Sequence, residues 1–356
     1  MSRPQIEETR DPTMIAVLRQ RDFSLLWFGG VLSSTGDWLL FIALPFFVYE
    51  RTGSALATGA MFAAETLPRL LFGSVAGVFV DRWDRKRTMV YADLLRAAIL
   101  VLLLLVVAGG PLALIYVVVF VEASVSMFFI PAKNALVPNL VEERQLTAAN
   151  SLNSMAEDVP TLIGPVLGGA LFAVVGLNGL IMLDIASYLL SAVAISLIVA
   201  RGTAAPDDEV PVVSAETATS AWANALREWL EGLRLVGRDS KVAAVFVVIS
   251  VATVGEGVFM VLAILFFRDV LGSGTTEFGY FWTCYGLGYV VGGLLLARLS
   301  DVVAETRLFA LSLIANGALI VAMFNVSVLP VLLVLAVPAG ITVIGWLVVA
   351  QTLLQR

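Results

Sequence analysis

The sequence predicts an all-α protein that crosses a membrane many times, and three observations support this fold class. Hydrophobic residues make up 59% of the 356-residue chain, whereas a soluble domain is about 45–50% apolar. The apolar residues gather in runs of membrane-spanning length, about 20 residues each. The charged residues, only 14% of the chain, gather mostly between those runs. Because backbone polar groups in lipid must be paired within their own segment, each run is expected to be a helix.

Ten apolar runs are long enough to cross the bilayer. They cover residues 25–48, 56–80, 88–108, 112–132, 152–175, 177–200, 242–267, 279–297, 308–324 and 329–350. The connections between them are short except for one long segment. We therefore predict a cytoplasmic N-terminal segment (1–22), a six-helix bundle (23–200), a cytoplasmic linker (201–241) and a C-terminal bundle of four helices (242–356).

The second part of the linker predicts an amphipathic helix. Its apolar residues recur at helical spacing, at Trp222, Leu226, Trp229, Leu230 and Leu233, with charged residues between them. Such a helix can lie on the inner membrane surface, or it can pack on the protein itself.

Positive charges lie mostly on one side of the predicted helices. Eighteen of the 22 Lys and Arg residues fall in the N-terminal segment, in the loops after the even-numbered runs, or at the C-terminus. By the positive-inside rule, that side and both termini are cytoplasmic. The first 22 residues are polar, so no cleavable signal peptide is expected.

The composition argues against an enzyme and against a metal site. The chain has no histidine and a single cysteine, Cys284, so neither an internal disulfide nor a Cys-based zinc site is expected. No nucleotide-binding loop is recognisable. We predict no cofactor and no nucleic-acid partner, and any proton relay has to use carboxylates.

The loop between the second and third runs is unusually charged. Its distinctive residues are Gly77, Asp81, Arg82, Asp84, Arg85, Lys86 and Arg87. A glycine at the end of a span lets two helices approach closely, and the Asp81 carboxylate can anchor guanidinium groups or a helix N-terminus. The basic residues can hold the loop at the anionic inner leaflet.

Charges inside the apolar runs are costly and usually face a cavity or a partner. Asp37, Glu122 and Glu256 lie centrally in their runs, and Glu65 is a further candidate. Each carboxylate is either a proton-binding group on a cavity wall or a structural partner. Glu65 and Arg69 are four residues apart, so they are expected to pair.

Two further groups of intramembrane charges lie nearer the helix ends. Asp93 and Arg96 are close to the cytoplasmic end of the third run and are expected to join Asp81 in a charge relay. Asp158 and Asp184 are expected to be structural partners.

Several of these segments resemble the major facilitator superfamily, and in particular its drug- and siderophore-exporting branch, which includes macrolide efflux proteins and the enterobactin exporter. The segments that carry the resemblance are 23–27, 36–37, the charged loop, 93–96, 129–138 and 164–169. The resemblance implies the fold of this superfamily, which has twelve helices. A chain with ten runs, six and four, is therefore expected to lack the last two.

The resemblance also implies a function. It implies a secondary active transporter that exports an amphipathic small molecule, of the drug, macrolide or siderophore type, by alternating access and driven by the proton gradient. Its expected location is the bacterial inner membrane, and its expected partners are the lipid bilayer, the substrate and protons, with the chain as a monomer. The expected absence of two helices keeps another interpretation open: a transporter remnant or membrane interaction protein that does not transport.

The resemblance suggests roles for two motifs. The charged loop is either a gate latch that breaks and reforms during alternating access or only a topology anchor. The run Gly164, Pro165, Gly168 and Gly169 resembles a motif of the fifth helix that is linked to export. Here the proline is expected to distort the helix, although ordinary helix packing also explains small residues there.

Overall fold

The computed structural model describes residues 13–80, 83–200, 227, 234, 240–299 and 303–354. Its elements within that part of the chain are all helical. They are α1 (Met14–Leu18), α2 (Arg21–Thr52), α3 (Ala55–Val80), α4 (Arg85–Val107), α5 (Ala113–Leu136), two 3₁₀ turns (Val137–Asn139 and Glu143–Gln145), α6 (Leu146–Ser196), α8 (Ser240–Leu265) with a π-helical turn (Phe266–Val270), α9 (Thr275–Leu299), α10 (Glu305–Phe324) and α11 (Leu329–Leu354). The predicted all-α polytopic fold is confirmed.

Each of the ten predicted runs coincides with a helix or with half of one. The long α6 contains two runs, which meet at Gly176, where φ is 64° and the backbone is not helical. Only glycine adopts this conformation without strain. At Gly164-Pro165, where a distortion is predicted, the backbone is helical, and the break in α6 lies at Gly176.

Seven helices in the described part of the chain are both long and apolar enough to cross a membrane. The protein is therefore a multi-pass membrane protein.

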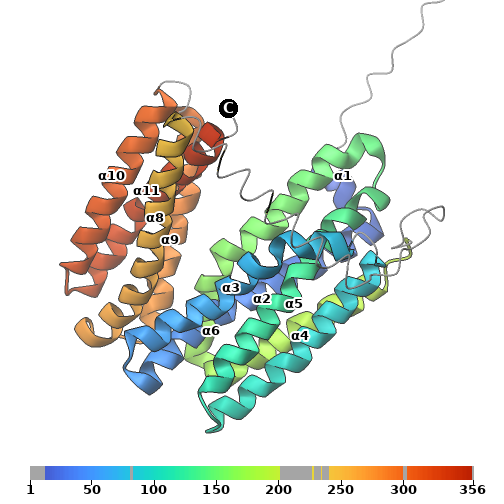
Figure 1. Ribbon diagram of the computed structural model, residues 1–356, viewed down its shortest axis with the longest axis horizontal. Helices are drawn as coiled ribbons and strands as arrows, with labels where there is room; N and C mark the ends of the chain where they lie inside the picture. The colour runs from blue at the N-terminus through green and yellow to red at the C-terminus, as the bar shows by residue number, and fades with distance from the viewer. Residues whose placement is uncertain are drawn as a thin grey trace, which may run out of the picture.

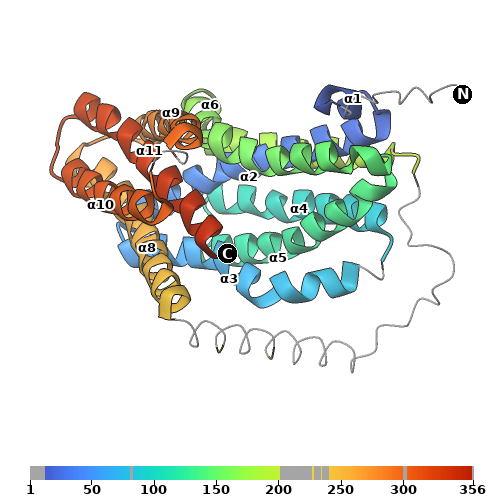
Figure 2. The same cartoon turned by 90° about the horizontal axis from the view of Figure 1, so that it is seen from above.

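The helices form two groups that lie side by side (Figure 1). In the first, α6 packs along α2 and α4, and α5 packs against α3 and α4. In the second, α11 packs between α9 and α10. Figure 2 shows the same two groups from above, with α1 at the far end of the first group. The first group contains α1 to α6 and the second α8 to α11. The predicted amphipathic helix of the linker falls outside the described residues apart from Arg227 and Arg234.

The two groups meet most closely where α6 crosses α9. A Cβ atom added to Gly169 would overlap the backbone of Gly279, and one added to Gly279 would overlap the backbone of Gly169. Two further glycines of the same motif pack on α2, Gly164 against Trp38 and Gly168 against Leu39. Small residues allow this approach of helix backbones, which supports the packing interpretation of the motif.

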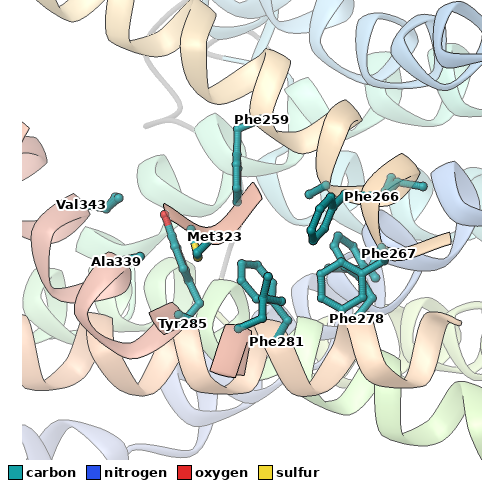
Figure 3. Close-up of a cluster of buried hydrophobic side chains, with 14 of the residues drawn as sticks. Phe259, Phe266, Phe267, Phe278, Phe281, Tyr285, Met323, Ala339 and Val343 are labelled. Atoms are coloured by element: carbon teal, nitrogen blue, oxygen red, sulfur yellow. The ribbon is translucent and has the colours of Figure 1, made fainter. Parts of the chain in front are cut away.

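The second group has an aromatic core. Figure 3 shows Phe259, Phe266, Phe267, Phe278 and Phe281 gathered between α8 and α9, with Tyr285 at one end of the row. Ring centroids of neighbouring pairs lie 5.0–6.3 Å apart, for example 5.0 Å for Phe267 and Phe278 and 6.3 Å for Phe259 and Phe281. Tilted and edge-to-face rings at these distances add to the stabilisation from burial. This packing holds α8 and α9 as one wall of the space between the two groups.

Candidate functional site

A cluster of charged side chains lies inside the first helix group. It contains Asp37 of α2, Asp93 and Arg96 of α4, Glu122 of α5, and Asp184 and Tyr188 of α6; we call it the Arg96 cluster. The Arg96 side chain is only 3% exposed. Its Nε donates a hydrogen bond of 2.6 Å to Glu122 Oε1, and its Nη2 donates to both Asp37 oxygens at 2.8 Å. One guanidinium therefore joins three helices.

Tyr188 completes this arrangement. Its ring lies 4.1 Å from the Arg96 Cζ atom, the geometry of a cation–π contact. Its hydroxyl is within hydrogen-bond distance of Asp37 Oδ1 and, at 2.9 Å, of Glu122 Oε1. A phenol has one donor hydrogen, so it donates to only one of these carboxylates at a time. Both contacts are satisfied together only when one of the carboxyls itself carries a proton.

Asp93 and Asp184 lie on either side of this centre and are almost completely buried. Asp93 Oδ1 is 3.8 Å from Arg96 Nη1, and neither Asp93 oxygen has a hydrogen-bond partner among the described residues. Asp184 Oδ1 accepts a bond of 3.1 Å from the Ser187 hydroxyl and lies directly against Gly36. A Cβ atom at position 36 would overlap this carboxylate, which is the physical reason for a glycine beside Asp37.

A small cavity of about 50 Å³ opens beside the cluster. Its polar wall consists of Asp37, Glu65, Glu122, Asp184 and Tyr188, and its apolar wall includes Phe41. A water molecule needs roughly 10–15 Å³ of such space and two to four polar partners. The cavity therefore has the size and the polar groups to hold water in contact with four carboxyl groups.

A second cavity of about 180 Å³ lies between the two helix groups; we call it the central cavity. Its walls come from α2, α6, α8, α9 and α11. Most of its lining is apolar and aromatic, and the residues with aromatic rings are Trp38, Phe41, Trp282, Tyr285 and Tyr289. Glu256 of α8 is the charged residue among the described residues of this lining. Phe41 contributes to both cavities, so the Arg96 cluster and the central cavity are neighbours along α2.

The two groups also touch where α2 and α8 end, at the face opposite the charged loop. The Tyr49 hydroxyl donates a hydrogen bond to Asp269 Oδ2 in the π-helical turn. Next to it, Arg268 Nη2 lies 3.8 Å from Glu50 Oε1. The rings of Phe46 and Phe278 pack 5.6 Å apart beneath this polar pair. These contacts join the two groups at that end, and no pattern in the sequence indicates them.

The charged loop is described only in part, because Asp81 and Arg82 lie outside the described residues. Asp84 caps α4 by accepting a 2.8 Å bond from the Arg87 N–H. Lys86 Nζ donates a 2.6 Å bond to the Ile198 carbonyl at the end of α6 rather than facing lipid alone. The predicted close approach at Gly77 is not seen, since an added Cβ atom there would meet no described atom within 4 Å.

Two predicted pairings can be compared with the structure. Glu65 lines the small cavity, Arg69 is exposed, and the two do not come within 4.0 Å. Asp93 and Arg96 do pair, at 3.8 Å, but Asp81 lies outside the described residues, so the relay to the loop stays a prediction. Arg96 lies eleven residues after Arg85, about 16 Å along α4. At that depth it also binds Asp37 and Glu122. These residues stand in different runs of the sequence, and contacts between helices of different runs are not visible in a single sequence.

Three further site residues were missed or misjudged. Asp184 was expected to be structural, yet it lines the small cavity with Asp37. Tyr188 and Tyr285 were not considered. Asp184 and Tyr188 are four residues apart in an apolar run, which places both on one helix face. This spacing is the sequence signal by which the two residues could be found.

This architecture, two helix groups with buried carboxylates and a cavity between them, is that of a membrane transporter. A family model described as transmembrane secretion effector, within the major facilitator superfamily, matches residues 12–355. The chain belongs to this family of transporters, and it is not an enzyme.

Individual relatives agree with this assignment. Macrolide efflux protein A of Streptococcus pyogenes is 27% identical over 309 residues, covering 83% of this chain and 73% of that protein. Multidrug efflux pump Tap of Mycolicibacterium fortuitum is 27% identical over 331 residues, covering 89% and 76%. In solved structures, the fold is similar to a bacterial homologue of the iron transporter ferroportin in its inward-facing state, with a TM-score of 0.65, 18% identity and coverage of 94% of this chain and 84% of that one.

Proposed function

We propose that this transporter exports an amphipathic organic cation in exchange for protons. The observation that carries the proposal is the adjacency of two sites along α2: the Arg96 cluster, rich in buried carboxyls, and the central cavity, which holds a single carboxylate among aromatic rings. Asp37 belongs to the first site and Trp38 to the second. A movement of this one helix therefore affects both sites.

Proton binding is assigned to the Arg96 cluster. Four carboxyl groups, from Asp37, Asp93, Glu122 and Asp184, surround one guanidinium, so full ionisation would leave three uncompensated negative charges in the protein interior. Unpaired buried charges are strongly unfavourable, and carboxyls take up protons instead. Asp37 is the most exposed of the residues that bind Arg96, at 36%, which makes it the group through which a proton enters. The small cavity provides room for the water that a proton transfer needs.

The central cavity favours a cationic substrate. Glu256 supplies a carboxyl group that a cationic substrate can pair with, and Trp38, Trp282 and the two tyrosines supply ring faces that attract cations. An anionic siderophore could not form this ion pair with Glu256, so the drug or macrolide type fits better than the siderophore type. The efflux proteins among its relatives support the same substrate class.

The proposal includes the membrane in which the protein lies and its orientation there. The distribution of basic residues supports a bacterial inner membrane protein with both termini in the cytoplasm, working as a monomer on the proton gradient without a cofactor. The contacts of Tyr49 with Asp269 and Glu50 with Arg268 then lie at the outer face. Export requires them to separate, so that the central cavity opens outwards.

The test is transport by the full chain in everted membrane vesicles, with a fluorescent lipophilic cation added outside the vesicles as the probe. Uptake driven by an imposed inward-acidic pH gradient, and abolished by a protonophore, is expected. Glu256→Gln should abolish it, and Asp37→Asn should uncouple it from the gradient. Glu142→Gln, at an exposed surface carboxylate, is the matched control and should transport normally. Uptake that does not depend on the pH gradient would disprove the proton coupling. Uptake by Glu256→Gln at the wild-type rate would disprove the role of Glu256 in substrate binding.

A further inference from the structure

A cavity of about 690 Å³, larger than the two sites above, lies between α3, α4 and α5. It is a groove on the surface of the first helix group rather than an interior space. Tyr91 on its wall is 66% exposed and Leu95 is 50% exposed. Its volume is within the range of small-molecule sites, about 300–1,000 Å³. Because these helices cross the membrane, the groove faces lipid.

The dimensions of the groove match one leaflet of a bilayer. On α4 the lining runs from Asp84, just before the helix, to Leu95, a distance of about 16 Å. The hydrocarbon core of a bilayer is about 30 Å thick. The groove therefore begins at the end of the helix and reaches the middle of the membrane, and apolar residues such as Leu95 and Val121 line its inner part.

The chemistry of the two ends differs. The end of the groove at the membrane interface, beside the charged loop, carries Arg87. This arginine is exposed, forms no ion pair with another described residue and stands in the first turn of α4. Asp84 is also there, but its carboxylate is engaged by the Arg87 N–H at 2.8 Å. Trp83 stacks on Phe128 at 5.8 Å beside this end, and an aromatic residue at this depth is typical of the membrane interface.

From this we infer that the groove binds an anionic phospholipid, with one acyl chain between α4 and α5 and the headgroup phosphate on the Arg87 guanidinium. An apolar trough one leaflet long with a cation at its interfacial end is complementary to a lipid. The positive end of the α4 dipole adds to the charge of Arg87. A zwitterionic lipid would bring an ammonium group to the same place, so the site discriminates by headgroup charge. This inference does not depend on the proposed export function.

The experiment is native mass spectrometry of the full chain in detergent, titrated with phosphatidylglycerol, with phosphatidylcholine of the same acyl chains, and with glycerol phosphate. Phosphatidylglycerol is expected to bind about fivefold more tightly than phosphatidylcholine, the effect of one basic residue at a membrane surface. Arg87→Gln should remove this preference and Arg87→Lys should keep it. Leu95→Trp, which fills the groove, should weaken both lipids.

Two variants serve as matched controls. Arg307→Gln removes an exposed arginine from the same position, the third residue, of α10. Val117→Trp adds the same bulk at an exposed α5 position outside the groove. Both should bind lipid as the wild type does. Equal affinity for the two lipids in the wild type, an unchanged preference in Arg87→Gln, or competition by glycerol phosphate as strong as by the lipid would each overturn the inference. Should Leu95→Trp fold poorly by circular dichroism, the Arg87 variants alone decide.

Discussion

Arg96 of α4 holds Asp37 of α2 symmetrically, with Nη2 placed 2.8 Å from each carboxylate oxygen. The same guanidinium binds Glu122 of α5 through Nε. Two helices are thus tied to α4 by separate nitrogens of one side chain, deep in the first helix group. Any change at Asp37, such as proton binding, alters the contact between α2 and α4.

Removal of the arginine is expected to be severe. Arg96→Met leaves several carboxyls without their common partner, and breaking a buried ion pair costs about 3–5 kcal/mol. Arg96→Lys should rescue little, because an ammonium cannot reproduce the two separate nitrogen contacts. Thermal unfolding of the purified protein measures the loss. Arg69→Met, at an exposed position, is the control. Wild-type stability in Arg96→Met would mean that the carboxyls compensate fully by protonation.

Tyr188→Phe separates the two contacts of this side chain. The ring still covers the Arg96 guanidinium, but the hydroxyl that reaches Asp37 and Glu122 is lost. We expect a loss of about 1 kcal/mol in stability and a much larger loss of proton-coupled transport. Tyr116→Phe is the control, since among the described residues its hydroxyl donates a hydrogen bond to the Ala57 carbonyl and contacts no carboxylate. Normal gradient-driven transport in Tyr188→Phe would exclude the hydroxyl from proton handling.

Gly169→Ala tests the contact between the two helix groups. The added methyl group would meet the Gly279 backbone, which cannot move without shifting α9. Because overpacking typically costs about 1–3 kcal/mol, stability and transport should both fall. The control is Gly317→Ala on α10, where a Cβ atom meets nothing within 4 Å. That change should be neutral or raise stability by up to about 1 kcal/mol. Equal behaviour of the two variants would contradict the close packing.

The contacts at the outer end of α2 are expected to differ in strength. Tyr49→Phe removes a hydrogen bond to a charged group, worth about 1.5–3 kcal/mol, which corresponds to roughly a ten- to hundredfold change in an equilibrium. Arg268→Gln should change little, because the side chains of Arg268 and Glu50 are 48% and 37% exposed and such pairs contribute little. The measurement is maleimide labelling of a cysteine at the buried Phe46 position in a Cys284→Ser background. The rate of labelling is expected to increase more for Tyr49→Phe than for Arg268→Gln. A larger increase in the labelling rate for Arg268→Gln would contradict this ranking.

Much of the candidate site was visible in the sequence as separate charges. Asp37, Glu122 and Glu256 stand out because a charge in the middle of an apolar run needs a reason. The partners of these residues were not visible. The predicted pairing of Arg96 with Asp93 is present at 3.8 Å, but its closer partners Asp37 and Glu122 were not indicated. Distance along one helix says nothing about which residues of another helix lie opposite, and for the same reason Asp184 was set aside.

The sequence by itself determined the class of protein, the ten apolar runs and the predicted orientation, because these depend on hydropathy and charge along the chain, which membrane insertion reads segment by segment. Only the tertiary structure decided that Arg96 joins Asp37 to Glu122, that Gly36 makes room for Asp184, and that Gly169 meets Gly279. These contacts depend on the rotation and depth of each helix against its neighbours. Packing between helices sets both quantities, and no single run of residues contains them.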